Sequence, residues 1–231
     1  MTSKSCDTKT EDQWDALYRQ GLGAPRYPNS YVVRWLFAHF PRRKAADFHL
    51  LDMGTGMGRH AMLMAKEGYH VTGTDVSATS LDQAKEWAKA EGLNISFRQA
   101  SADHHPFPDH SFDGIVSYGV LYYLSFNKFN LAITEIHRLL KPGGSAFVMV
   151  KSDRDVRKTK GEMIAPHHYK ITVKDETMPW HNEVGMALTL LPKSEIIKCF
   201  KEFSAMTIEE VTSTLEGGKY LESAWLVYVR K

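Results

Sequence analysis

The stretch Leu50-Leu51-Asp52-Met53-Gly54-Thr55-Gly56-Met57-Gly58 decides the fold of this chain. In it, an apolar run ends in an acidic residue, and glycines follow at every second position. Glycine lets the backbone turn sharply and approach a ligand closely, because it has no Cβ atom. The stretch therefore predicts a buried strand, a tight turn that contacts a ligand, and a helix that begins directly after the turn.

Strand and helix patterns alternate regularly from this turn onward. Strands are predicted at residues 48–53, 69–74, 94–99, 112–118 and 146–150. Apolar residues at helical spacing follow the first, second and fourth of these strands, at residues 57–68, 81–88 and 129–140. Units of this order form right-handed crossovers, so the sequence predicts a mainly parallel sheet with helices on both faces.

The C-terminal part of the chain has a different pattern. A helix is predicted at residues 195–203, and two strands are predicted at residues 205–213 and 224–230. The connection between these strands is too short for a crossover helix, which takes about a dozen residues or more. We therefore expect them to pair antiparallel at the sheet edge. The predicted fold class is α/β: a doubly wound, mostly parallel, seven-stranded sheet with one antiparallel strand near the C-terminus.

Composition and charge limit the possible partners. The 231 residues are 43% hydrophobic and 24% charged, as in an ordinary globular protein. With 29 basic and 27 acidic residues, the net charge of +2 gives no reason to expect a nucleic acid as partner. No apolar stretch approaches the roughly 20 residues that a membrane span needs, so no membrane partner is expected.

Two further features indicate where the protein acts. The polar start lacks the apolar segment of a secretory signal. Cys6 and Cys199 lie far apart in the sequence and form no disulfide framework. Together they lead us to expect a cytoplasmic protein. No sequence pattern predicts the oligomeric state.

Four motifs, in this order, resemble those of the class I S-adenosylmethionine-dependent methyltransferases that act on small molecules, the type 11 and type 25 group. They are Asp52-x-Gly54-x-Gly56-x-Gly58, Asp75 at the end of the second predicted strand, Ser101-Ala102-Asp103 ahead of Phe107-Pro108-Asp109-x-x-Phe112-Asp113, and Leu140-Lys141-Pro142-Gly143-Gly144. The resemblance covers residues 48–150. It implies S-adenosylmethionine as cofactor and methyl transfer to a small molecule by in-line displacement, with release of S-adenosylhomocysteine.

The resemblance also implies a division of the single domain. Residues 1–47 would form an N-terminal helical lid, and residues 48–151 the cofactor-binding core. Residues 152–192 would be a substrate-recognition insertion, and residues 193–231 the C-terminal helix and edge strands.

The turn and the second strand are expected to bind the polar half of the cofactor. Asp52, Gly54, Thr55 and Gly56 would contact its amino acid and ribose, and the N-terminus of the following helix favours its carboxylate. Asp75, with Val76 beside it, would accept both ribose hydroxyls, as acids do in dinucleotide folds. Two alternatives stay open: Asp52 could organise the turn without touching the cofactor, and Asp75 could merely cap the next helix.

The adenine and the sulfonium are expected to contact later strands. Asp103 would accept from the adenine amino group, with Ala102 beside the ring, although Asp103 could also be only a loop acid. Tyr118 would lie near the methionine part, where an aromatic face attracts a cation.

Two regions outside the core are expected to complete the site. In the N-terminal segment, the resemblance implies that Tyr18, Arg26 and Tyr27 are candidate lid residues, although Trp14 and Tyr18 could simply pack an added helix onto the core. The insertion would form a recognition flap over the methyl group, with His167, His168, Tyr169, Trp180, His181 and Glu183, and its histidines are candidates for a general base. No spacing fits a zinc site, so no metal is expected.

Other functions stay open. A glycine-rich turn also serves nicotinamide-dependent oxidoreductases, but their G-x-G-x-x-G pattern places a third glycine where this chain has Arg59. A non-catalytic S-adenosylmethionine sensor would keep the same pocket. The sequence Ser117-Tyr118-Gly119-Val120 differs from the Asn/Asp-Pro-Pro-Tyr segment of enzymes that methylate nucleobases or protein amides, which favours a small metabolite as acceptor.

Overall fold

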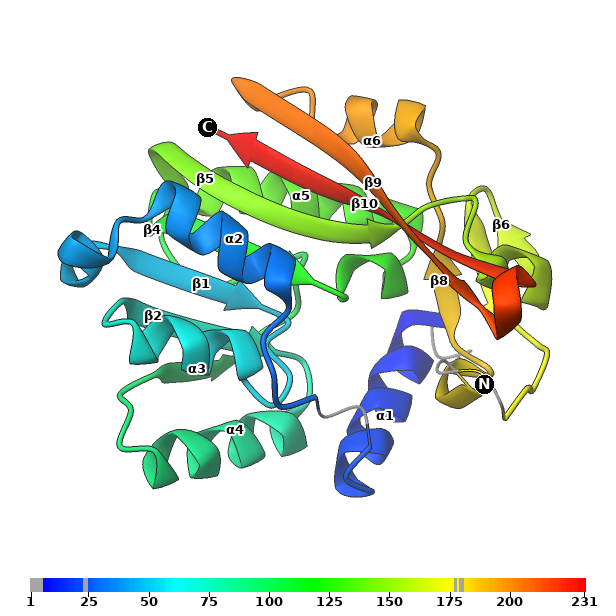
Figure 1. The fold of residues 1–231 in the computed structure, drawn as a ribbon, viewed down its shortest axis with the longest axis horizontal. Helices are drawn as coiled ribbons and strands as arrows, with labels where there is room; N and C mark the ends of the chain where they lie inside the picture. Colours follow the sequence, from blue (N-terminus) through cyan, green and yellow to red (C-terminus); the bar gives the residue numbers. More distant parts are fainter. Residues whose placement is uncertain (1–5, 23–24, 177, 179–180) are drawn as a thin grey trace.

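The computed structural model describes residues 6–22, 25–176, 178 and 181–231, and a seven-stranded sheet forms its centre (Figure 1). The strand order is β3-β2-β1-β4-β5-β10-β9. The strands are β1 (His49–Met53), β2 (His70–Asp75), β3 (Ser96–Gln99), β4 (Phe112–Tyr118), β5 (Leu140–Lys151), β9 (Ala205–Leu215) and β10 (Tyr220–Arg230).

The first five strands run parallel, as predicted. Helices α3 (Arg59–Lys66), α4 (Ala78–Ala90) and α5 (Phe126–Leu139) make the crossovers. From β1 the chain adds β2 and β3 on one side of this strand, and it then adds β4 and β5 on the other side. In doubly wound sheets, ligands bind at this kind of switch point, outside the carboxyl ends of the strands.

The C-terminal hairpin adds the antiparallel strand that the short connection predicts. Strand β10 lies between β5 and β9 and is antiparallel to both. The strands are longer than predicted, because residues 214–215 and 220–223 also pair across the hairpin. A single turn, η5 (Glu216–Gly218), joins them.

Helices cover both faces of the sheet, and each face has its own apolar core. Helix α2 (Ser30–His39) packs Trp35 and Leu36 on one face, together with Phe147 of β5. On the other face, α5 packs Phe129, and α6 (Lys193–Cys199) precedes the buried Phe200. Helix α6 ends four residues earlier than predicted, since Phe200 leaves helical geometry.

Residues 152–192 fold as a small antiparallel sheet beside the main one. Its strands are β6 (Gly161–Ala165), β7 (His168–Ile171) and β8 (Ala187–Thr189), in the order β6-β7-β8. The short helices η3 (Val156–Lys160) and η4 (His181–Glu183) flank them. Trp180 lies outside the described residues.

Helix α1 (Cys6–Arg19) lies apart from the sheet, near α4 and β8 (Figure 1). The remaining short helices are η1 (Arg42–Asp47) and η2 (Leu121–Tyr123). No helix in the described part of the chain combines the length and the apolar character that crossing a membrane requires.

Candidate active site

Two adjoining cavities lie at the carboxyl ends of β1, β2 and β4. Both are lined by Trp14, Tyr18, Gly54, Gly119 and Tyr123. The first cavity extends along β2 and the loop after β3, where its walls include Asp75, Val76, Ala100, Ser101, Ala102 and Leu124. The second extends over the glycine turn, and its walls include Thr55, Gly56, Arg59, His60, Tyr118, Tyr122 and Met149.

The glycine turn fits closely under its neighbours. At Gly54 a Cβ atom would lie 2.3 Å from Val120, and at Gly56 it would lie 2.7 Å from the Tyr18 hydroxyl. Both glycines have positive φ angles, 73° and 53°. Larger residues at these two positions would therefore be strained and would fill the space between turn and lid.

Asp52 lies behind the turn and does not line either cavity. Its Oδ2 accepts hydrogen bonds from the Thr55 hydroxyl at 2.6 Å and from the backbone N–H of Ala61 at 3.1 Å. Burial raises the pKa of Asp52 to about 6. Asp52 thus organises the turn and the start of α3, as the alternative interpretation holds.

Asp75 connects the turn to the next helix and also lines the first cavity. Its Oδ2 accepts from the N–H of Gly56, and its Oδ1 accepts from the N–H of Ser77, both at 2.9 Å. Burial raises the pKa of this carboxyl group. The N-cap of α4 is Ser77, whose hydroxyl accepts from the N–H of Ser80, so Asp75 is not the helix cap.

The two residues expected beside adenine are placed differently. Ala102 lines the first cavity together with Ser101. Asp103 accepts a hydrogen bond from the Ser101 hydroxyl and is not among the lining residues. Ser101, and not Asp103, therefore lines this part of the cavity.

Tyr118 lines the second cavity. Its hydroxyl accepts a hydrogen bond of 2.8 Å from the side chain of Asn29, and burial raises its pKa. This aromatic ring therefore stands beside the glycine turn.

Helix α1 closes the cavities from outside. Tyr18 is buried under the turn, and Trp14 packs edge-on against Tyr123 with ring centroids 5.0 Å apart. Asp15 accepts a 2.7 Å hydrogen bond from the Ser77 hydroxyl, which ties α1 to α4. The helix thus packs on the core and lines the cavity at once.

Arg26 does not reach the cavities. It is exposed, and its guanidinium lies 5.2 Å from the centroid of the Trp87 ring on the outer side of α4. This cation–π contact holds Arg26 on the surface, so the structure gives no support to its prediction as a lid residue.

The three histidines proposed as general bases also lie away from the cavities. His168 contacts the Thr189 hydroxyl at 2.9 Å, and His181 contacts the carbonyl of Met178 at 2.9 Å. His167 stands in a tight turn with its ring against Phe126. The three side chains contact strand β8, helix α5 and the segment before η4 instead of the cavities, contrary to the expectation that they face the methyl group.

His60 and Arg59, by contrast, line the second cavity although the sequence did not single them out as site residues. The N–H of Asn29 donates to Nε2 of His60 at 3.3 Å, so the ring proton lies on Nδ1, which faces Asp52 at 3.9 Å. Burial lowers the pKa of His60 to about 3, and the ring stays neutral.

Arg59 is a half-buried cation at the first position of α3. Its guanidinium lies 5.7 Å from the centroid of the Tyr118 ring and donates a 3.4 Å hydrogen bond to the carbonyl of Tyr27. Among the described residues, no carboxylate forms an ion pair with it. Such a cation, next to a helix N-terminus, is suited to an anionic ligand.

In the same described residues, no group of three or more His, Cys, Asp or Glu side chains is arranged to hold a metal ion. The site therefore consists of the glycine turn, acids behind it and beside it, an arginine, and an aromatic wall.

Comparison with known proteins identifies residues 50–144 as a match to the methyltransferase domain family. Demethylmenaquinone methyltransferase of Thermus thermophilus is 34% identical over 127 residues, which are 51% of this chain and 54% of that protein. An uncharacterized methyltransferase of Bacillus subtilis, YodH, is 28% identical over 74% of this chain and 72% of its own. The chain thus spans only about half the length of the first of these relatives.

Solved structures share the fold over nearly the whole chain. 1,6-Didemethyltoxoflavin-N1-methyltransferase of Burkholderia thailandensis, with bound 1,6-didemethyltoxoflavin and S-adenosylhomocysteine, matches with a TM-score of 0.68 at 17% identity, over 100% of this chain and 92% of that one. An S-adenosylmethionine-dependent methyltransferase of Methanosarcina mazei matches with a TM-score of 0.65 at 20% identity, over 89% and 98%.

Proposed function

We propose that this chain, whose residues 50–144 match the methyltransferase domain family, is a class I S-adenosylmethionine-dependent methyltransferase that transfers a methyl group to a small organic molecule. The observation that carries the proposal is that Asp75 and the glycine turn, which are far apart in sequence, meet at one pair of cavities. When bound, S-adenosylmethionine supplies a methyl group activated by its sulfonium, which an acceptor atom attacks in line.

The donor groups in the cavities match the parts of the cofactor. Asp75 lines the first cavity, and its carboxylate would be the acceptor that the ribose hydroxyls need. The side chains of Val76, Ala102 and Leu124 offer an apolar surface for the adenine ring. Arg59 and the N-terminus of α3 suit a carboxylate.

The remaining walls of the second cavity suit the reaction. Tyr118, Tyr122, Tyr123 and Trp14 surround the space next to the turn and limit access of water. In methyl transfer, the protein contributes mainly by holding the two reactants in line and close together. The buried, neutral His60 lines the same cavity and is a better placed candidate for contact with the acceptor than the histidines of the insertion.

The relatives support a small molecule as acceptor. They include demethylmenaquinone methyltransferases and a ubiquinone biosynthesis O-methyltransferase of Chelativorans, which is 33% identical over 124 residues. An aromatic wall around the second cavity fits a planar organic acceptor better than a highly charged one.

Two measurements test the proposal in sequence. Titration calorimetry with S-adenosylhomocysteine and with NADH should show binding of the sulfur nucleoside only. Binding of NADH alone would favour the oxidoreductase. A screen of a metabolite library for release of S-adenosylhomocysteine then identifies the acceptor, and binding without any turnover across a broad library would favour a sensor.

A further inference from the structure

Two tyrosine hydroxyls connect the cavities with a buried acid. The hydroxyl of Tyr122 lies 3.3 Å from that of Tyr123, which lies 3.1 Å from Oε1 of Glu183. Tyr122 and Tyr123 line the second cavity, and the Tyr122 oxygen is the nearest atom to the Cβ position of Gly119, a residue of both cavities. Glu183 belongs to the insertion, in η4.

The direction of these hydrogen bonds follows from chemistry. An ionised carboxylate only accepts, so Tyr123 donates to Glu183 and must accept from Tyr122. Burial raises the pKa of both tyrosines far above neutral pH, so both keep their protons. Both O–H groups therefore point away from the cavity, toward Glu183, and the free lone pairs of the Tyr122 oxygen are left on the cavity side.

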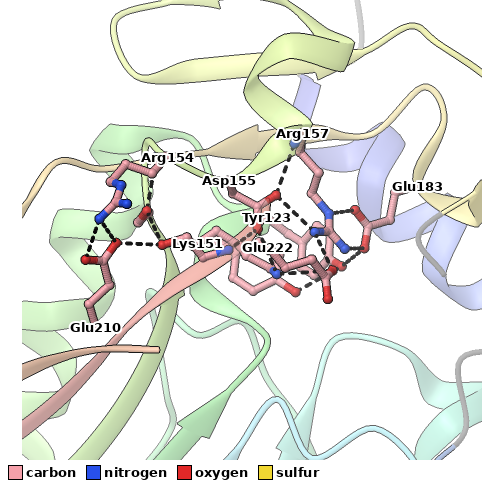
Figure 2. A network of polar contacts seen from close by, with 11 residues as sticks. Tyr123, Lys151, Arg154, Asp155, Arg157, Glu183, Glu210 and Glu222 are labelled. Carbon is pink, nitrogen blue, oxygen red and sulfur yellow. Dashed lines mark hydrogen bonds and ion pairs between the residues drawn. The ribbon is translucent and has the colours of Figure 1, made fainter. Parts of the chain in front are cut away.

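Glu183 is part of a buried network of charges behind this tyrosine wall (Figure 2). Arg157 contacts Glu183 at 2.6 Å, and it contacts Asp155 and Glu222 at 3.0 Å each. Lys151 contacts Asp155 at 3.1 Å and Glu222 at 3.7 Å. Among the described residues, these two cations face three carboxylates, so the network carries one negative charge in excess.

Asp155 and Arg157, at the centre of the network, stabilise each other's charges. Burial opposes the ionisation of Asp155, but Lys151 and Arg157 outweigh it, and its pKa lies below the ordinary value. Burial also opposes the charge of Arg157, but Glu183 and Asp155 outweigh it and raise its pKa. The outer pair of Arg154 and Glu210 is neutral as a unit and leaves the excess charge unchanged.

Building on the proposed function, we infer that this network is the counter-charge for the sulfonium of the cofactor, so that the site binds cationic S-adenosylmethionine in preference to neutral S-adenosylhomocysteine. The argument rests on position and sign. Excess negative charge that is shielded from water acts over a longer range than surface charge, and the two oriented hydroxyls extend its potential to the cavity wall. The preference favours exchange of the spent product for fresh cofactor.

The inference is tested by titration calorimetry of the full chain with three probes. S-adenosylmethionine and sinefungin carry a positive charge at the reacting position, as a sulfonium and an ammonium, and S-adenosylhomocysteine does not. Glu183→Gln keeps the size of the side chain and an acceptor for Tyr123 but removes the charge. This variant should lower the affinity for both cationic probes by about tenfold relative to the affinity for S-adenosylhomocysteine.

Two further variants make the comparison specific. Glu210→Gln removes the same unit of charge at the opposite end of the network, near Arg154, and should leave the ratio of affinities nearly unchanged (Figure 2). Tyr123→Phe removes only the oriented hydroxyl and should lower the ratio by a smaller factor than Glu183→Gln. Retained affinity for S-adenosylhomocysteine shows that each variant still forms the site.

The outcomes separate the two proposals. If Glu183→Gln and Tyr123→Phe lower the affinity for all three probes equally, or for none, the network is structural and the inference is wrong. Binding of the probes by the unmodified protein would still support the proposed function. If the unmodified protein binds none of the probes, the proposed function itself is wrong.

Discussion

The carboxylate of Asp75 accepts a 2.9 Å hydrogen bond from the backbone N–H of Gly56, although 19 residues separate them in the chain. The bond joins the end of β2 to the glycine turn after β1. One acid therefore shapes the turn and also lines the first cavity. This double role means that a change at Asp75 acts on ligand binding and on the turn together.

The first prediction concerns this acid. Asp75→Ala should lower the affinity for S-adenosylhomocysteine by roughly 2–4 kcal/mol, because two charge-assisted hydrogen bonds to ribose hydroxyls are lost. Calorimetry measures the loss. Asp82→Ala, an exposed acid of α4 that pairs only with Lys85 among the described residues, should leave the affinity unchanged. Equal affinities in both variants would exclude Asp75 from the ligand site.

The second prediction separates backbone strain from crowding at Gly56. Gly56→Ala should reduce the free energy of unfolding more than Gly92→Ala. Both positions have positive φ, which costs about 1–2 kcal/mol for alanine, but a Cβ at Gly92 has no neighbour within 4 Å. Urea unfolding measures both.

The crowding at Gly56 comes from the Tyr18 hydroxyl, so a double variant provides the control. Tyr18→Phe combined with Gly56→Ala should recover the part of the loss that exceeds the cost at Gly92. If the two substitutions are strictly additive, the lid tyrosine does not contact the turn in solution.

The third prediction concerns the pH dependence of stability. Burial raises the pKa of Asp52 to about 6 from its ordinary value of 3.8, so the folded state binds a proton more tightly than the unfolded chain. The contribution of Asp52 to stability is therefore complete below pH 3.8 and is lost as the pH rises through about 6, with a full span of roughly 3 kcal/mol.

Asp52→Asn should remove this dependence while its amide oxygen still accepts from Thr55 and Ala61. The buried His60 and His105 act in the opposite sense, because burial lowers their pKa values to about 3 and 4 and stability is lost on acidification. The difference between protein and variant, measured by urea unfolding from pH 4.5 to 7.5, isolates Asp52. A constant difference across this range would contradict the raised pKa.

The sequence predicts the centre of the sheet well because strands β1, β4 and β5 are buried. A continuous apolar run such as residues 146–150 is the signal of such a strand, and Gly54 and Gly119 mark the ends of β1 and β4. The hairpin at the C-terminus is predicted for a simpler reason: a short connection admits only antiparallel pairing.

The sequence predicts the parts of the site that are formed by backbone turns. It does not predict the parts that depend on packing between distant segments. Gly54, Gly56 and Asp75 follow directly from strand ends, and all three line the cavities. The lining role of Trp14 depends on how α1 lies over Tyr123, which local sequence does not encode. The histidines of the insertion looked catalytic by residue type alone, but the small sheet places them elsewhere.

The last prediction concerns Arg59, which stands where a dinucleotide-binding motif would have its third glycine. Arg59 lines the second cavity, and among the described residues no carboxylate pairs with it, so we expect it to bind the carboxylate of the cofactor. Arg59→Met should weaken the binding of S-adenosylhomocysteine by about 1.5–3 kcal/mol. The same variant should not weaken the binding of 5′-methylthioadenosine, which has the same nucleoside and sulfur but no amino acid group.

Arg26→Met is the matched control, because Arg26 is also an arginine of this region but lies outside over Trp87. It should affect neither probe. Calorimetry of both variants with both probes decides between a charge that binds the ligand and one that supports the fold, since a structural role for Arg59 would weaken the two probes to the same degree. Loss of binding in Arg26→Met alone would instead restore the lid role that the sequence suggested for Arg26 and would require the N-terminal segment to move when the ligand binds.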